Sequence, residues 1–395
     1  MDDAHRPVLI AGARTPIGKF QGALSSLSAT QLGAVAVKAA IERAGLKPSD
    51  IEEVILGNVL QAGLGQNPAR AAALWAGIPD SVSAVTINKV CGSALKAIML
   101  AAQAIKAGDR QVVVAGGMES MTNAPHLLMG SRTGIKFGEG KLLDHMQHDG
   151  LWDQYNDFAM GVTGEIVAER HHITRTQSDA FAERSHRLAL AAQNAGRFDA
   201  ELVPVSIPQR KGEPIVVRHD EGIRADTTAV GLAKLKPSFK PDGQVTPGNA
   251  SQISDGAAAL VVASLAYAKA HKLPILAEIL AYDASGTKPE WVMEAPILSV
   301  QNLLAKAKLG IADIDLLEHN EAFASASCAV AKGVGIADAK FNVNGGAVAL
   351  GHPIGASGAR LALTLAHELK RRGGGKGVAT LCLGGGNAVS ILLKV

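Results

Sequence analysis

The chain has 395 residues, of which 47% are hydrophobic and 19% charged, and this balance excludes a disordered or fibrous protein. The formal net charge of +3 is too small and too evenly spread to indicate nucleic-acid binding. Three cysteines in a chain of this length do not make a disulfide scaffold, and free thiols indicate a reducing compartment.

The N-terminal residues lack the charged and then apolar layout of a signal peptide. The longest nearly apolar run, Gly256–Ala268, is shorter than the ~20 residues that span a bilayer, so it predicts a buried strand or helix. We therefore expect a cytoplasmic protein without a membrane partner.

The first part of the chain alternates short apolar strands with helices. Apolar residues at helical spacing followed by glycine predict helices that end at Gly45 and Gly108. The predicted elements, in order, are strand Val8–Gly12, helix Gln31–Ala44, strand Val54–Leu56, helix Leu95–Ala107 and strand Val112–Val114. This alternation is typical of an α/β fold.

The pattern then repeats at an offset of about 264 residues, which indicates a chain built from two similar α/β halves. Leu46–Val54 resembles Leu309–Leu317, and Ser93 with its helix resembles Ser357 with the helix that follows. Met121–Ile253 lies between the halves and is richer in Pro, Gly and His, with helical pieces at Gly164–Arg170 and Gln177–Ala195. This change in composition predicts that the segment is an insertion that covers a site or an interface.

Cys91 stands just before a predicted helix, and Gly92 and Ser93 allow a sharp turn that would expose its sulfur. Free N–H groups and the helix dipole at such a position favour a thiolate and lower the thiol pKa. This predicts a nucleophile, although cysteine is also commonly a small buried apolar residue.

His352 lies in a glycine-rich stretch, and Pro353 holds it in an extended conformation. At the offset of 263 residues that relates Leu46 to Leu309, Cys91 corresponds to residue 354, so two halves that face each other would bring these helix starts together. The pair could act as nucleophile and base.

Cys382 ends a predicted strand and is followed by Gly384 in a run of three glycines, whose N–H groups could form an oxyanion hole. A second thiol of near-neutral pKa could move a proton to or from carbon or sulfur. We interpret Cys328, in an Ala-rich helical stretch, as structural. The histidine pairs lack a convincing set of metal partners, so no metal is predicted.

These residues resemble the thiolase family along nearly the whole chain. The motifs that carry the resemblance are Asn88–Leu95, Gly116–Met121, Gly248–Ser251, Asp255–Ala258, Asn320–Ala324, Gly351–Gly355 and Cys382–Gly386. The resemblance implies a five-layered αβαβα fold of two similar halves with an inserted loop domain. The implied limits are 1–120 and 254–274 for the N-terminal half, 121–253 for the loop domain and 275–395 for the C-terminal half.

The resemblance also implies the activity, an acyl transfer in which two acetyl-CoA reversibly condense to acetoacetyl-CoA plus CoA. Cys91 would carry the acyl group as a thioester, His352 would activate Cys91, and Cys382 would remove the α-proton of the second acetyl-CoA. The backbone N–H groups of Cys91 and Gly384 would hold the acyl oxygen. The enolate oxygen would face His352 and a water held by Asn320.

Coenzyme A is implied as substrate and product, with no separate cofactor, and the assembly implied is a homotetramer built as a pair of dimers. By resemblance, Ser251 contacts the pantetheine and Arg224 lies at the nucleotide end. Core packing is as good an explanation for the apolar residues that match the pantetheine channel, which are Leu151, Met160, Phe239 and Phe323.

One departure bears on specificity: Ala159 stands where short-chain members of the family usually carry His. The absence of this histidine would remove a polar group from the acyl pocket and admit longer or branched acyl chains. A broader 3-ketoacyl-CoA thiolase of fatty-acid breakdown is therefore the alternative. A decarboxylating ketoacyl synthase fits poorly, since those enzymes resemble a Cys-His-His pattern. A scaffold without activity is disfavoured because the expected catalytic side chains are present.

Overall fold

A computed structural model describes residues 2–395 of the chain. Its main sheet has the strand order β14-β15-β16-β13-β1-β12-β5-β3-β4, with β2 added beside β12. The strands are β1 (Pro7–Arg14), β2 (Gly18–Lys19), β3 (Glu53–Gly57), β4 (Ser83–Ile87), β5 (Val112–Ser120), β12 (Ser254–Ser264), β13 (Ala277–Gly286), β14 (Leu316–His319), β15 (Lys376–Leu383) and β16 (Asn387–Lys394).

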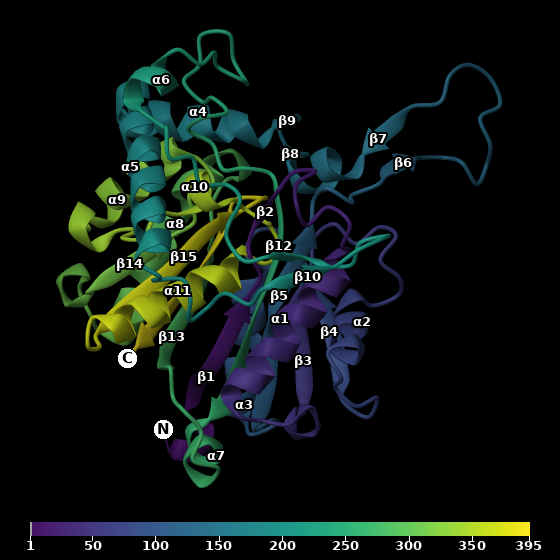
Figure 1. Cartoon of the computed structure of the whole chain (residues 1–395). Helices are drawn as coiled ribbons and strands as arrows, with labels where there is room; N and C mark the ends of the chain where they lie inside the picture. The colour runs from purple at the N-terminus through teal and green to yellow at the C-terminus, as the bar shows by residue number, and fades with distance from the viewer. Residues whose placement is uncertain (1) are drawn as a thin grey trace.

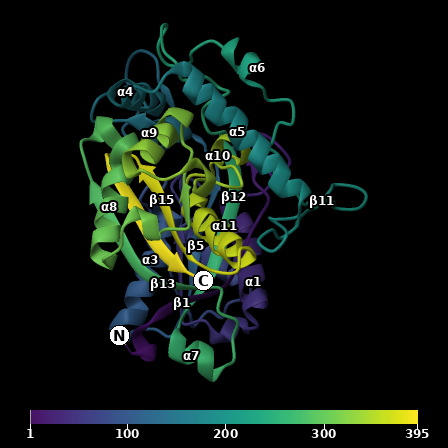
Figure 2. The same cartoon turned by 90° about the vertical axis from the view of Figure 1, so that its left-hand side faces the viewer.

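Helices cover both faces of this sheet and lie between its two halves (Figure 1 and Figure 2). They are α1 (Ala29–Ala44), α2 (Pro68–Trp75), α3 (Ser93–Ala107), α4 (Met160–His171), α5 (Arg175–Asn194), α6 (Ala229–Ala233), α7 (Leu265–Ala270), α8 (Ala295–Ala307), α9 (Ala324–Val334), α10 (Ala347–Leu350) and α11 (Ser357–Arg371). The predicted α/β class is confirmed.

The layers follow from which helix touches which strands. Helices α1 and α2 pack on the half of the sheet that contains β3 and β5, and α8 packs on the half that contains β13, β15 and β16. Helices α3 and α11 pack on each other, and each contacts strands of both halves. Separate apolar clusters fill the spaces between these layers. The order is helix, sheet, helices, sheet, helix, which is the predicted five-layered arrangement.

The two half-sheets are continuous, because β1 pairs with β13 through Val8 opposite Glu278 and Leu9 opposite Ala277. The internal repeat is also visible in the structure. A short 3₁₀ turn precedes β3 and another precedes β14, and helix α3 leads into β5 as α11 leads into β15. The pairs β3–β5 and β14–β15 are both parallel. The starts of α3 and α11 are therefore equivalent positions of the two halves.

The predicted helix ends are accurate because their signals are local. Helix α1 begins with a capping box of Ser28 and Gln31 and ends at Gly45, whose φ is 71°. Helix α3 ends at Gly108, with φ 83°. The apolar run from Gly256 to Ala268 is mostly the buried strand β12, followed by α7.

The inserted region holds the hairpins β6 (His126–Leu128) with β7 (Leu142–Asp144), β8 (Trp152–Asp153) with β9 (Phe158–Ala159), and β10 (Val205–Ile207) with β11 (Ile215–Val217). The chain between β6 and β7 forms an arm that projects from the body (Figure 1). The strand order does not by itself divide the chain into domains, so the predicted domain limits stay a prediction.

A buried ion-pair cluster ties the insertion to β1. Arg14 Nε lies 2.6 Å from Glu201 Oε1, and its Nη1 and Nη2 lie 2.7 and 2.9 Å from the two carboxylate oxygens of Asp220. All three side chains are almost fully buried. Such a bidentate guanidinium pair fixes geometry as well as charge.

One segment, Val90–Ala107, is long and apolar enough to cross a membrane. It is more than half buried, and its helix α3 packs between the two halves of the sheet. The buried core helix of a globular protein can be as long and as apolar as a membrane-spanning helix, and α3 has the position of a core helix.

Candidate active site

A cavity of about 60 Å³, called here the inner cavity, lies at the end of β15 and beside the segments that precede α3 and α11. Four residues predicted as catalytic line it: Cys91, His352, Cys382 and Gly384. The fifth, Asn320, lies behind His352, with Nδ2 3.2 Å from the histidine Nε2. The other lining residues are Val90, Gly150, Leu151, Met160, Ser251, Val292, Met293, Ala322, Phe323, Ile354 and Leu383.

Cys91 stands on a tight turn directly before α3. Val90 has φ 47°, in the left-handed region that β-branched residues rarely adopt. Ser93 holds this turn, because its Oγ accepts from the Lys89 N–H at 2.8 Å and donates to the Val90 carbonyl at 2.6 Å. Backbone strain maintained beside a thiol marks the turn as a functional element.

The sulfur of Cys91 faces two backbone donors, the N–H groups of Cys91 itself and of Gly384. Burial, with the neighbouring Cys382 as the next cause, raises the pKa of the Cys91 thiol well above its ordinary value, and the two donors offset this only in part. The expectation that the helix start lowers this pKa is therefore wrong, because desolvation outweighs the dipole. The sulfur is half-buried rather than exposed, and it stays protonated until a base removes the proton.

His352 has the geometry of such a base. Its Nδ1 lies 2.6 Å from Ser357 Oγ, and that hydroxyl donates to the Pro353 carbonyl at 3.0 Å. Because the hydroxyl hydrogen is used on the carbonyl, Oγ accepts from Nδ1–H, and Nε2 is left as an acceptor. Burial, together with the charge of Arg360, lowers the pKa of His352 to about 3, so the ring is neutral near pH 7. Asn320 Nδ2 donates to Nε2.

Cys382 is buried near the end of β15, beside the run of glycines in which Gly385 and Gly386 have φ 81° and 77°. Burial raises the pKa of Cys382 to about 12, so the near-neutral value expected from the sequence is not found. Its thiol donates to the sulfur of Met293 at 3.6 Å. A thiol of high pKa forms a strongly basic thiolate once it is ionised.

A second cavity of about 380 Å³, called here the outer cavity, adjoins the inner one. His352 and Phe323 line both cavities, so the histidine lies where they meet. The outer cavity is mostly apolar, as expected of a ligand channel that fixes orientation with few polar groups.

The predicted channel residues lie along this route: Leu151, Met160, Ser251 and Phe323 line both cavities, and Phe239 lines the outer one. The rings of Phe239 and Phe323 meet edge to face with centroids 6.4 Å apart. Gly161 leaves room for Phe239, since a Cβ at this position would lie 2.1 Å from the ring.

Ala159 lines only the outer cavity. The predicted effect of Ala159 on acyl-chain length stays a prediction, because its side chain borders the cavity that adjoins the inner one. Val292 and Met293 border the inner cavity.

Two predicted residues lie away from the cavities. Arg224 is exposed, and its backbone N–H donates to His186 Nδ1 at 3.1 Å. Since it lines neither cavity, its contact with the nucleotide end stays a prediction. Cys328, predicted as structural, lies in a groove between α5 and α9, with Sγ 3.9 Å from the Gln177 carbonyl.

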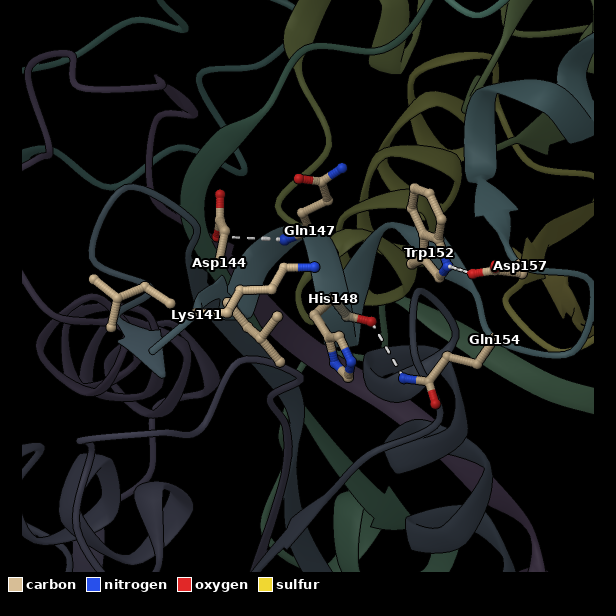
Figure 3. Close-up of a pocket in the computed structure, with 9 residues that line it drawn as sticks. Lys141, Asp144, Gln147, His148, Trp152, Gln154 and Asp157 are labelled. Atoms are coloured by element: carbon tan, nitrogen blue, oxygen red, sulfur yellow. Dashed lines mark hydrogen bonds between the residues drawn. The ribbon is translucent and has the colours of Figure 1, made fainter. Parts of the chain in front are cut away.

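A third cavity, of about 430 Å³, lies at the base of the arm and shares Asp144 and Gln147 with the outer cavity. Figure 3 shows its polar lining, in which Trp152 Nε1 donates to Asp157 Oδ1 at 3.1 Å. None of the predicted catalytic residues lines it. The predicted catalytic residues therefore point to the inner cavity and not to this one.

Reasoning from the sequence missed three residues that shape the site. From the sequence, Ser357 is only a marker of the repeat and Ser93 is a marker and a small residue of the turn, whereas in the structure their hydroxyls fix the His352 ring and the Cys91 turn. A serine at the same position in both halves, directly before a helix, was the signal that could have found them. Met293 has no such signal, because its contact with Cys382 joins residues distant in sequence.

Comparison with known proteins agrees with this geometry. Residues 7–266 match the family model described as Thiolase, N-terminal domain, and residues 273–395 match Thiolase, C-terminal domain. The chain belongs to the thiolase family. The predicted resemblance, the thiolase fold and an acyltransferase activity are thereby confirmed.

Similar thiolases include the acetyl-CoA acetyltransferase of Pseudomonas aeruginosa, 51% identical over 386 residues and 98% of each chain. The acetyl-CoA acetyltransferase of Cupriavidus necator is 52% identical over 387 residues and 98% of each chain. The crystal structure of the Bacillus anthracis acetyl-CoA acetyltransferase matches with a TM-score of 0.97 and 43% identity over 100% of both chains. None of these matches tests the roles of individual site residues, which stay predictions.

Proposed function

We propose that this thiolase catalyses the reversible condensation of two acetyl-CoA to acetoacetyl-CoA and CoA. The observation that carries the proposal is the inner cavity, where two thiols, a neutral imidazole and the N–H of Gly384 line one small space. The names of the similar enzymes from P. aeruginosa and C. necator support the same reaction. Coenzyme A is then substrate and product, and the chemistry needs no separate cofactor.

In the first half-reaction, His352 Nε2 takes the proton of the Cys91 thiol, and the thiolate attacks the acetyl-CoA carbonyl. Charge develops on the carbonyl oxygen, and the N–H groups of Cys91 and Gly384 are the donors that face this point. Collapse of the intermediate breaks the bond to the CoA sulfur, which leaves with the proton held by His352. An acetyl thioester remains on Cys91.

In the second half-reaction, His352 Nε2 takes the proton of the Cys382 thiol, and the Cys382 thiolate removes an α-proton from another acetyl-CoA. The electron pair stays on the substrate as an enolate, whose oxygen can be held by a protonated His352 Nε2 next to Asn320. The enolate carbon attacks the acetyl carbonyl on Cys91 and displaces the Cys91 thiolate, which takes the proton back from His352 Nε2. The covalent intermediate predicts ping-pong kinetics.

The volume of the inner cavity favours a short acyl group. About 60 Å³ is room for roughly four or five water molecules, which suits an acetyl or acetoacetyl fragment better than a long chain. The small Ala159 widens only the outer cavity. This argument favours the acetoacetyl-CoA reaction over the broader 3-ketoacyl-CoA thiolase.

The test is CoA-dependent loss of acetoacetyl-CoA absorbance, beside 3-ketohexanoyl-CoA and 3-ketooctanoyl-CoA, with Cys91→Ala as the control. Turnover limited to the four-carbon substrate and lost in Cys91→Ala is expected. Equal or faster turnover of the longer substrates would replace the proposal with the broader thiolase. Well-folded protein without turnover of any substrate would end the catalytic interpretation.

We further propose a homotetramer in the cytoplasm. The arm between β6 and β7 carries large apolar side chains in contact with solvent, including Phe137, which is 100% exposed, and Met129, which is 65% exposed. Exposed apolar residues on a projecting hairpin indicate an interface, here with a second copy of the chain. A mass measurement in solution tests this, since Phe137→Asp should shift a tetramer toward smaller species.

A further inference from the structure

The thiol of Cys382 has a partner that the reaction scheme above does not use. Its Sγ lies 3.6 Å from Met293 Sδ, with the thiol as donor. Both side chains are about 97% buried, and both belong to one small apolar cluster that also holds Val292 and Phe323. A thioether sulfur is a weak acceptor, but a buried thiol has few alternatives.

The segment that carries Met293 is firmly held. Met293 lies in a 3₁₀ helix, Pro289–Glu294, whose last residue is clamped by α4. Glu294 accepts from Arg170 Nε and Nη2 at 3.0 and 2.9 Å, and its Oε2 lies 2.7 Å from His171 Nε2. The Arg170 guanidinium also lies over the Trp291 ring, 3.9 Å from its centroid. Bidentate and cation–π contacts of this kind fix a backbone segment in place.

We infer that Met293 is a positioning residue for the carbon-acid step: its sulfur accepts the S–H hydrogen bond of Cys382 and so stabilises the protonated thiol and fixes its rotamer. This inference rests on the proposed function, which assigns α-proton transfer to Cys382. Met293 then acts only in the second half-reaction, in which the α-proton is transferred.

The chemical step balances without another reactant. The Cys382 thiolate takes the α-proton, an S–H bond forms as the C–H bond breaks, and the electron pair remains on the substrate as the enolate. A thiolate has no hydrogen to give to Met293, whereas the thiol has one. The contact therefore stabilises Cys382 with its proton both before the thiolate forms and after the α-proton is taken, and its effect on the rate comes from holding the sulfur in the rotamer that receives the proton. Acetyl transfer to Cys91 does not involve this proton.

The first measurement is independent of activity. With three cysteines in the chain, the S–H stretching band of Cys382 is assigned in the Raman spectrum as the difference between wild type and Cys382→Ala. A frequency lowered by hydrogen bonding, which rises to that of a free thiol in Met293→Leu, is expected. Met99→Leu, the same change at a buried position of another cluster, should leave the band in place. A free-thiol frequency in the wild type overturns the inference whether or not any Met293 variant folds.

The second measurement separates the half-reactions. Met293→Leu, a nearly volume-conserving change, should slow condensation by about three- to tenfold, as expected for one weak hydrogen bond. Exchange of labelled CoA into acetyl-CoA, which uses Cys91 and His352, should fall by a clearly smaller factor than condensation, because Met293 borders the inner cavity but the Cys382 proton takes no part in exchange. Equal losses in both assays would mean a change of pocket shape and would overturn the inference. If the wild-type protein shows neither exchange nor condensation, the proposed function is wrong. The Raman band would still show whether the Cys382 thiol donates a hydrogen bond to Met293.

Discussion

Ser93 and Ser357 occupy the first residue of α3 and of α11, and each hydroxyl donates to a backbone carbonyl of the turn before its helix. Ser93 donates to Val90 at 2.6 Å, and Ser357 donates to Pro353 at 3.0 Å. In one half the bond maintains the turn that presents Cys91. In the other half, the bond uses the hydroxyl hydrogen of Ser357, so the serine oxygen accepts a hydrogen bond from the His352 ring. One duplicated feature thus supports both the nucleophile and its base.

Replacement of Ser357 by Ala should weaken the base. Without the hydroxyl, Nδ1–H loses its acceptor and the ring is free to carry the proton on Nε2, where it cannot accept from Cys91. We expect both half-reactions to slow by about 10- to 100-fold, part of the ~10²–10⁴-fold that a positioned general base contributes. Labelled-CoA exchange and condensation measure this. Ser357→Thr, which keeps a hydroxyl, should recover part of the loss, and wild-type exchange in Ser357→Ala would contradict the assignment.

The raised pKa of the Cys91 thiol predicts how its reactivity depends on pH. Because the thiolate is the reactive form and the thiol pKa lies above the tested range, alkylation by iodoacetamide should rise about tenfold per pH unit from pH 6 to 9 without a plateau. Mass spectrometry of the Cys91 peptide follows the rate. A plateau near neutral pH would instead show a thiolate–imidazolium pair, and acetyl-CoA should protect the site at every pH.

The close fit of Gly161 against Phe239 predicts an effect on substrate binding alone. Gly161→Ala would push the ring out of its place in the outer cavity, while the inner cavity keeps its lining. We expect KM for acetoacetyl-CoA to rise roughly three- to tenfold, in line with loss of one aromatic contact, with kcat retained. Thermal stability should not fall, since alanine favours a helix over glycine. A loss of kcat with unchanged KM would refute this use of Phe239.

The buried pairing of Arg14 predicts a large effect on stability. Arg14→Met would leave the carboxylates of Glu201 and Asp220 buried without their cation, a change that costs about 3–5 kcal/mol. Differential scanning calorimetry should show a marked fall in the temperature of the first unfolding transition. Arg218→Met, at an exposed position of the same segment, should change stability by less than about 0.5 kcal/mol. Similar midpoints for both variants would mean that the cluster does not anchor the insertion.

The parts of the fold that the sequence predicts best are those with local or repeated signals. Gly45 and Gly108 end their helices as expected, and the repeat correctly relates the start of α3 to that of α11. The cavity that holds Cys91, His352 and Cys382 also follows from the repeat together with the family motifs. These features depend on neighbours in the sequence or on a copied pattern.

What could not be predicted depends on burial and on contacts between distant segments. The position of Cys91 at a helix start suggests a lowered pKa, but the cost of desolvation is known only when the walls of the cavity are known. Ala159 lies near Met160 in sequence, yet only the folded chain shows that the former stays outside the inner cavity. The contact of Met293 with Cys382 spans two segments that no local pattern connects.

The packing of α3 against α11 has a consequence for how such a chain could arise. Each half of the fold contributes one helix start, and the nucleophile belongs to one half and the base to the other. A chain of half this length could bring two helix starts together only by pairing with a second copy, and its two sites would then be identical. Joining the copies into one polypeptide is what allows the two equivalent positions to diverge into a thiol and an imidazole.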